Sequence, residues 1–270
     1  MTAQIKNSLH KKRPKAFSLT ELSVIIVVAS IIAAGVLSVS GGKVGNNKVK
    51  VTNDRINEIY KALGSYAVAN KRMPCPASIT AVKSSDSNYG VEGTTAGDCT
   101  AGTGVYAGGT NLVYGMVPIK TLGLRSSVGE DGFGNKIAYF VDKSFTDSAT
   151  FTSTSGSITI QKYTAGALST VATSQMFVLV SYGANQSSSF GSNSDAQNTV
   201  TADTDEMSND ATTFNNLAKT ASFTNTLTAS TERSTVFDDI IFYKSRDNLL
   251  MDNQALTITH PNITTGSNLK

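Results

Sequence analysis

The chain has 270 residues, a net charge of +3 and an isoelectric point near 8.7, with 16% charged residues, two cysteines and no tryptophan. This composition excludes a collagen-like repeat, a cysteine-dense scaffold and a highly charged disordered chain. A basic balance is also typical of nucleic-acid-binding proteins, so the position of the positive charges matters.

The positive charge is concentrated at the start of the chain. Residues 1–16 contain five lysines and arginines and no acidic residue, so residues 17–270 carry a net charge of −2. Such a segment can bind nucleic acid, bind anionic lipid or orient a membrane segment. Because the rest of the chain is slightly acidic, we expect no nucleic-acid partner.

An uncharged apolar run follows this basic segment. Residues 22–39 read LSVIIVVASIIAAGVLSV, and 18 such residues predict a tilted membrane-spanning helix. Lysine and arginine before the run predict that the N-terminus is cytoplasmic and that the chain after about residue 42 lies across the membrane. A cleaved secretory signal peptide is the alternative, although no AxA-like cleavage site is evident beyond Ala33–Ala34.

The residues between these two segments form a specific motif. The stretch KAFSLTE at 15–21 resembles the processing site of type IV pilins and type II secretion pseudopilins. In that family a prepilin peptidase removes a basic leader before a phenylalanine, the phenylalanine is methylated, and a glutamate lies five residues into the mature chain. The resemblance implies cleavage between Ala16 and Phe17 and an assembly role for Glu21. The family usually has glycine before the cut, so Ala16 leaves the efficiency of processing open.

A carboxylate at the edge of an apolar run is costly unless it has a partner, so Glu21 either lies in the headgroup layer or meets a positive group on another chain. An unpaired charge in a low-dielectric environment is heavily penalised. In a filament, the free amine of Phe17 in a neighbouring subunit could pair with Glu21 and set the register between subunits.

The resemblance implies a structural subunit, not an enzyme, of a type IV pilus or type II secretion pseudopilus, and the long body favours a minor subunit. Its implied partners are other pilin or pseudopilin subunits, the prepilin peptidase and methyltransferase, the inner-membrane assembly platform and, before assembly, membrane lipid. The implied location is the bacterial inner membrane, single-pass, with a cytoplasmic N-terminus and a periplasmic C-terminal domain, and then the pilus or pseudopilus. The alternative function is a membrane-anchored periplasmic or surface adhesin or binding domain that does not assemble into a filament.

Helical periodicity returns after the glycines at 41, 42 and 45. Apolar residues then recur at the spacing of one helix face, and Pro74 stops the pattern. We therefore predict one helix from about Leu19 to Asn70 whose second half packs on a sheet. The residues of this face are Ile56, Ile59, Tyr60, Leu63, Tyr66 and Ala67.

The two cysteines, Cys75 and Cys99, lie in the part of the chain predicted to be outside the cytoplasm. An even number of cysteines in such a segment predicts a disulfide, here closing a loop rich in glycine, serine and threonine. Two thiols with no nearby histidine make a poor zinc site, and a catalytic thiol is expected even less.

Beyond the helix, turn residues followed by apolar or β-branched runs predict strands. The long polar stretches between them are expected to form loops, and a final turn and edge strand are expected over residues 248–262. The predicted strands lie within residues 130–141, 157–163, 176–183 and 236–247.

The expected fold is α+β, with a long N-terminal helix packed on an antiparallel β-sheet in a pilin-like arrangement. The first half of the helix is expected to span the membrane and the second half to be amphipathic. The expected segments are a leader at 1–16, a transmembrane or filament-core helix at 17–42, the amphipathic helix half at 43–72 and an α+β globular domain with long polar loops at 73–270.

A late acidic group could bind calcium, because closely spaced oxygen ligands suit a hard cation. The chain has no EF-hand pattern, so a solvated polar loop is the simpler interpretation and we expect no cofactor. The only histidines are His10 and His260, and no nucleophile elbow, Walker loop or dinucleotide-binding motif is present. We therefore expect no enzyme. The calcium candidates are Asp203, Asp205, Glu206 and Asp210.

Overall fold

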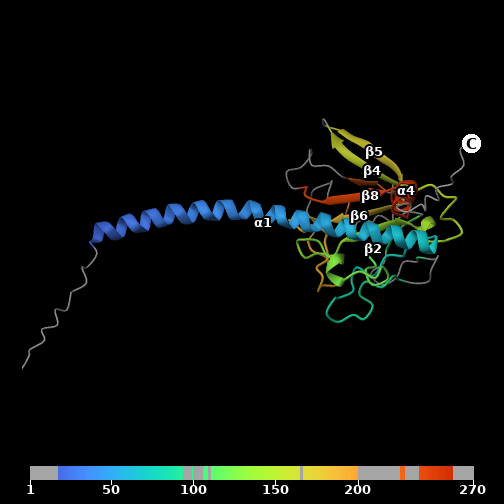
Figure 1. Cartoon of the computed structure of the whole chain (residues 1–270), viewed down its shortest axis with the longest axis horizontal. Helices are drawn as coiled ribbons and strands as arrows, with labels where there is room; N and C mark the ends of the chain where they lie inside the picture. Colours follow the sequence, from blue (N-terminus) through green and yellow to red (C-terminus); the bar gives the residue numbers. More distant parts are fainter. Residues whose placement is uncertain are drawn as a thin grey trace, which may run out of the picture. The chain divides into compact units, whose positions relative to one another are not determined.

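A computed structural model describes residues 18–93, 99, 106–108, 111–164, 167–199, 209, 226–228 and 237–257 (Figure 1). The leader, the predicted cleavage site at Ala16 and Phe17, and all four calcium candidates lie outside these residues. The chain divides into two compact units, residues 1–46 and 47–270.

Helix α1 runs over Leu19–Asn70, a length of 52 residues. Within the second unit, its side chains at positions 52, 56, 59, 63 and 67 are 2% exposed or less, so one helical stripe is buried. The helix ends where Lys71 takes a left-handed backbone conformation with φ of 53° and donates its N–H to the carbonyl of Ala67 at 2.9 Å. This is a common way to terminate a helix, and Pro74 follows it.

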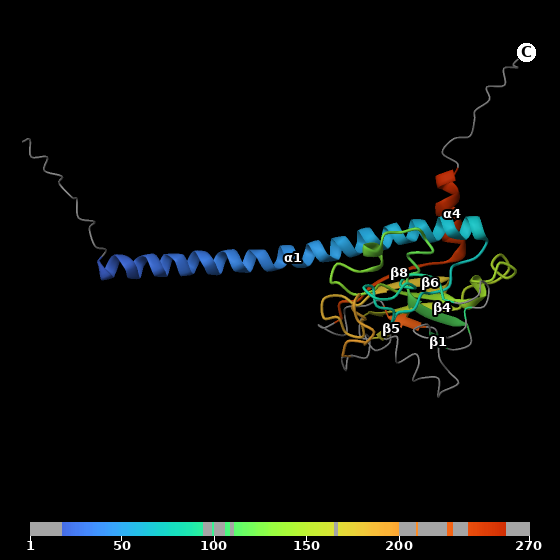
Figure 2. The ribbon, with the colours of Figure 1, turned by 90° about the horizontal axis from the view of Figure 1, so that it is seen from below.

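Five strands form an antiparallel sheet in the order β1-β2-β3-β6-β8. Strands β2, β3 and β6 are buried at every position, as expected for apolar and aromatic strands covered on both faces. Residues 47–70 of α1 cover one face (Figure 2), where the ring of Tyr60 lies 6.5 Å from Phe177 and 5.1 Å from Phe242. The strands are β1 Tyr106–Gly108, β2 Leu112–Met116, β3 Ala138–Asp142, β6 Phe177–Ser181 and β8 Ile240–Lys244.

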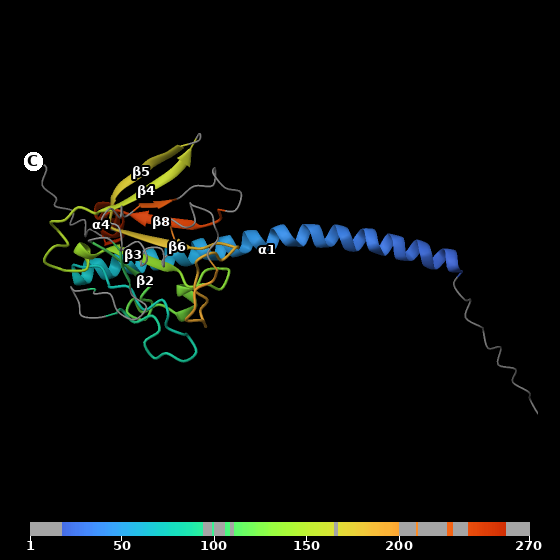
Figure 3. The same ribbon diagram turned by 180° about the vertical axis from the view of Figure 1, so that it is seen from behind.

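A second sheet has three strands in the order β5-β4-β7. Strands β4 (Ile158–Thr164) and β5 (Ala167–Gln175) form an antiparallel hairpin, and β7 (Thr226–Thr228) pairs with β4 in the parallel direction. Figure 3 shows the hairpin beside β8. Two short 3₁₀ helices lie between strands: η1 Ser126–Gly129 between β2 and β3, and η2 Lys143–Phe145 between β3 of the first sheet and β4 of the second.

Helix α4 (Arg246–Thr257) occupies part of the segment in which a turn and edge strand were expected, so that expectation is wrong. Leu249 is fully buried and Asn253 is 8% exposed, and the Asn253 amide donates to the Leu249 carbonyl at 2.8 Å. A Cβ atom added at Gly64 of α1 would lie 1.9 Å from the Asn253 amide nitrogen. Glycine at position 64 therefore allows α4 to approach α1 closely.

Two parts of the predicted fold are wrong. In the part of the chain that the structure describes, no helix is long and apolar enough to cross a membrane, so the predicted transmembrane first half and the single-pass inner-membrane location are contradicted. The single antiparallel sheet is replaced by two sheets, one of which contains a parallel pair.

A tight turn around Asp131 organises the loop between η1 and β3. The Asp131 carboxylate is buried and accepts hydrogen bonds at 2.9 Å from the backbone N–H groups of Phe133 and Asn135. The hydroxyl of Ser181 on β6 donates to its second oxygen at 2.7 Å. Burial raises the pKa of Asp131, and the hydrogen bonds from Ser181 and the turn oppose this rise. The carboxylate thereby fixes the turn to the sheet.

The same turn is tied to helix α1. The Arg55 guanidinium donates to the carbonyls of Glu130 and Asp131 at 3.0 and 2.9 Å. The Gly132 N–H donates to the Thr52 hydroxyl at 2.9 Å. A Cβ atom at Gly132 would lie 2.1 Å from the carbonyl oxygen of Lys48, so only glycine allows this contact without movement.

We predict that Gly132→Ala lowers the free energy of unfolding by about 1–3 kcal/mol, because the added methyl group forces the turn away from α1. Gly191→Ala is the matched control, since its Cβ atom would make an ordinary contact of 3.6 Å. Urea unfolding of the full chain measures both. Equal midpoints for the two variants would contradict the close turn–helix contact.

Candidate functional site: the apolar start of helix α1

The start of helix α1 presents apolar side chains on every side. Successive residues of a helix are rotated by about 100°, so a continuous apolar run surrounds the helix instead of forming one stripe. Helices of this kind are normally buried, and exposed apolar surface of this extent marks an interaction site. The side chains of Leu22, Val24, Ile25, Ile26, Val27 and Val28 expose between 49% and 61% of their surface.

The backbone of Glu21 lies in the first turn of α1, whereas its side chain is outside the described part of the structure. Ser18 precedes the helix and accepts the Leu22 N–H at its carbonyl at 3.1 Å. The spacing Ser18-x-x-Glu21 matches a capping box, in which serine and glutamate satisfy the first N–H groups of a helix. Either glutamine or glutamate can occupy this position of a capping box. A change from glutamate to glutamine therefore separates capping from any role of the negative charge.

The predicted disulfide is confirmed. Cys75 and Cys99 are joined, with their Cα atoms 5.6 Å apart, and both are buried. In the chain-entropy model, a loop of this length restricts the unfolded state by about 3 kcal/mol. The disulfide belongs to the second unit, so it supports the globular body and not the apolar start of α1.

An ion pair that the sequence did not reveal connects the end of α1 to the disulfide. Arg72 and Glu92 form two parallel hydrogen bonds of 3.0 Å, and the Cys75 N–H donates to Glu92 at 3.0 Å. Burial acts to raise the pKa of Glu92, but the bonds from Arg72 and Cys75 outweigh it and hold this pKa below its usual value. A bidentate pair of this kind fixes geometry as well as charge.

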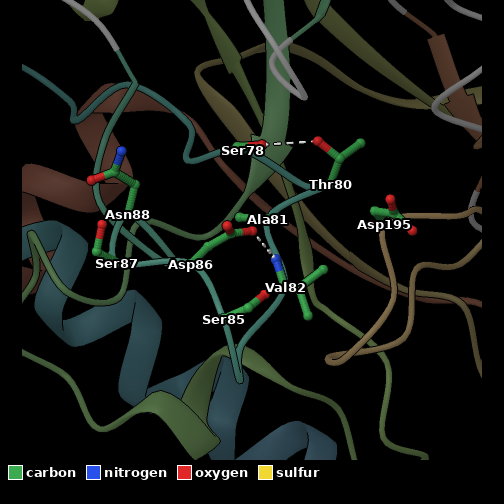
Figure 4. A pocket seen from close by; sticks show the side chains of 9 residues that line it. All are labelled: Ser78, Thr80, Ala81, Val82, Ser85, Asp86, Ser87, Asn88 and Asp195. Carbon is green, nitrogen blue, oxygen red and sulfur yellow. Dashed lines mark hydrogen bonds between the residues drawn. The ribbon is translucent and has the colours of Figure 1, made fainter.

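A polar pocket of about 670 Å³ opens on the second unit (Figure 4). Serine, threonine and asparagine side chains line it, and Asp86 and Asp195 come from different chain segments. The Asp86 carboxylate accepts the Val82 N–H at 2.6 Å, and the hydroxyls of Ser78 and Thr80 are 3.1 Å apart. Among the described residues, no group of three or more His, Cys, Asp or Glu side chains could hold a metal ion.

A buried lysine connects two chain segments that contribute residues to this pocket. The Lys136 ammonium donates to the carbonyl of Ile79 at 2.6 Å and to that of Ser194 at 2.8 Å, next to the lining residues of two walls. It also lies 6.0 Å from the ring centres of Tyr89 and Phe190. Burial lowers the pKa of Lys136 to about 8, and the negative charges of Asp195, Asp86 and Glu130 oppose this effect.

The apolar segment was visible in the sequence as an uncharged run, whereas the Lys136 and Glu92 interactions were not. Their partners are distant in sequence, and neither residue belongs to a motif. The Ser18-x-x-Glu21 spacing was the one overlooked local signal. No protein-family model, curated protein or solved structure matches the chain. The functional interpretation therefore depends on the chain's own residues.

The lowered pKa of Lys136 predicts a pH dependence of stability. Its usual pKa is 10.5, so the folded chain binds fewer protons than the unfolded chain between about pH 8 and 10.5. The free energy of unfolding that Lys136 contributes must then rise with pH over this range.

We expect the stability of the wild type relative to Lys136→Met to increase by on the order of 2 kcal/mol between pH 8 and 9.5. Below about pH 7, where Lys136 is protonated in both states, the difference should be flat. Lys162→Met, at an exposed position of β4, is the control and should follow the wild type. Urea unfolding at each pH measures the effect, and a constant difference across the range would show that Lys136 titrates normally.

Proposed function

We propose that the chain is a structural subunit of a filament of the type IV pilus or type II secretion pseudopilus kind. In this proposal a prepilin peptidase removes residues 1–16, and the apolar start of α1 packs among the corresponding helices of other subunits. The observation that carries the proposal is the uncovered apolar surface of residues 22–28. No catalytic role is proposed.

The apolar segment supplies enough surface for such an association. Burying one valine, isoleucine or leucine side chain contributes about 1.5–3 kcal/mol. Six such side chains, each about half exposed, therefore offer roughly 5–10 kcal/mol, comparable to the roughly 4–15 kcal/mol that association costs in lost translational and rotational freedom. Contacts with several neighbouring helices would add to this, as a filament provides.

Apolar packing alone does not specify the register between two neighbouring helices, because similar apolar contacts form at several axial positions. Glu21 would specify the register if its carboxylate pairs with the free amine of Phe17 in a neighbouring subunit. Other registers would leave a carboxylate unpaired among apolar helices, which is strongly disfavoured. A pairing of this kind specifies register, as buried polar residues do in coiled coils. In this proposal processing comes before assembly, since cleavage creates the amine.

We expect Glu21→Gln to be processed and folded but not assembled. Glutamine fits the same Ser-x-x-Glu/Gln capping pattern, so the loss isolates the charge. Glu58→Gln is the matched control on the same helix, because the Glu58–Arg125 pair is 3.8 Å apart and largely exposed, and such pairs contribute little.

The variants are produced as full chains in bacteria that contain a prepilin peptidase and a filament assembly system. Electron microscopy of sheared filaments measures assembly, and gel mobility measures processing. Filaments from Glu21→Gln at the wild-type level would rule out the charge pairing. Loss of filaments in Glu58→Gln as well would point to a general defect of the helix.

A further inference from the structure

The polar pocket of the second unit is lined by side chains that are not engaged with the rest of the described structure. The Asp195 carboxylate makes no hydrogen bond or ion pair with another described residue, and neither do the side chains of Ser85, Ser87 and Asn88. One oxygen of the Asp86 carboxylate accepts a backbone N–H at 2.6 Å, whereas its other oxygen has no partner among the described residues. Unused hydrogen-bonding groups from two chain segments therefore meet at one cavity.

The walls of this pocket are negatively charged. Asp86 and Asp195 line it, and none of the described lining residues is a lysine or an arginine. The Lys136 ammonium is nearby, but Lys136 is fully buried and its hydrogen bonds go to the carbonyls of Ile79 and Ser194, which are not lining residues. An anionic ligand would meet two carboxylates with no positive group on the walls, so the charge of the pocket favours a cation.

The size and composition of the pocket fit an organic cation better than a metal ion. Its volume of about 670 Å³ lies within the range of small-molecule sites, roughly 300–1,000 Å³. The described residues contain no group of three or more His, Cys, Asp or Glu side chains that could hold a metal ion. The hydroxyl and amide oxygens can accept N–H donors, and Ala81 and Val82 offer apolar surface to a short carbon chain.

Hydrogen bonds to the backbone hold the pocket walls in place. The Lys83 N–H donates to the carbonyl of Ser192 at 3.0 Å, which links the loop before Asp86 to the segment that carries Asp195. On the other side of this loop, the Lys120 ammonium donates to a backbone carbonyl, that of residue 87, at 2.6 Å. A site whose shape is fixed before binding loses less conformational entropy when a ligand arrives.

We propose that this pocket binds a small aliphatic amine whose ammonium groups pair with the carboxylates of Asp86 and Asp195. Figure 4 shows these two side chains on different chain segments. Charge-assisted hydrogen bonds of this kind are about twice as strong as neutral ones. Each ammonium group has three donors, so the neighbouring hydroxyl and amide oxygens would accept those that the carboxylates leave over. The site belongs to the second unit and does not depend on the proposed filament function.

Isothermal titration calorimetry of the full chain with a four-carbon diamine tests the proposal. The matching four-carbon diol has a similar length and forms hydrogen bonds, but it carries no charge. At low ionic strength, where surface charges are least screened, we expect the diamine to bind one saturable site at least about tenfold more tightly than the diol. Equal affinities, or no saturable binding of the diamine, would overturn the proposal.

Variants of single carboxylates locate the site. Asp86→Asn and Asp195→Asn each remove one charge with little change of shape, and each should weaken diamine binding by about fivefold, as expected for a charge pair near the surface. Asp247→Asn is the matched control, because it removes the same charge from a side chain of α4 that is 72% exposed and does not line the pocket. Circular dichroism shows whether the variants are folded.

The control separates the pocket from general attraction between the diamine and surface carboxylates. We expect Asp247→Asn to bind the diamine as the wild type does. If the three variants weaken binding equally, or if neither pocket variant weakens it, the diamine does not bind in this pocket and the proposal is wrong.

Discussion

The uncovered apolar surface at the start of helix α1 is the constraint on which the rest of the account depends. Over residues 22–28, isoleucine, valine and leucine side chains face solvent on all sides of the helix. Leaving this half-exposed surface in water forfeits roughly 5–10 kcal/mol of favourable burial. In the proposed filament, the corresponding helices of other subunits would cover it. The charge of Glu21 would then decide which register of that packing is allowed.

The second unit is stabilised by contacts among its own residues. The buried stripe of α1 from Thr52 to Ala67 covers the five-stranded sheet, and the turn around Asp131 binds both elements. The Arg72–Glu92 pair and the disulfide fix the chain where it leaves α1. The two parts of helix α1 therefore differ. The stripe from Thr52 to Ala67 is buried within the second unit, whereas the apolar side chains of residues 22–28 are exposed. In the proposed filament, the second unit would form the folded body and the start of α1 would be the assembling segment.

Much of this was predictable where the signal was local. Apolar residues from Ile56 to Ala67 recur at helical spacing, and β3 and β6 are dense apolar strands between turn residues, so periodicity identifies them. Helix α4 was missed because its burial depends on Leu249, Asn253 and the close approach at Gly64, which no local pattern encodes. Strand β5 is rich in serine and threonine and exposed, so it has the composition of a loop. The hydropathy of residues 22–39 predicted a membrane-spanning helix. This prediction is contradicted, because no helix among the described residues is long and apolar enough to cross a membrane. The Arg72–Glu92 and Lys136 contacts join distant segments, which a single sequence does not relate.

The central claim is that the chain becomes an assembly-competent subunit when the leader is removed before Phe17. Mass spectrometry of the protein isolated from the producing cells tests it most directly, because it determines the first residue and any methyl group on it. We predict a chain that begins at Phe17 with a methylated amine and retains the apolar helix and Glu21. A chain that still begins at Met1, or one that begins after about residue 42 without the apolar segment, would contradict it.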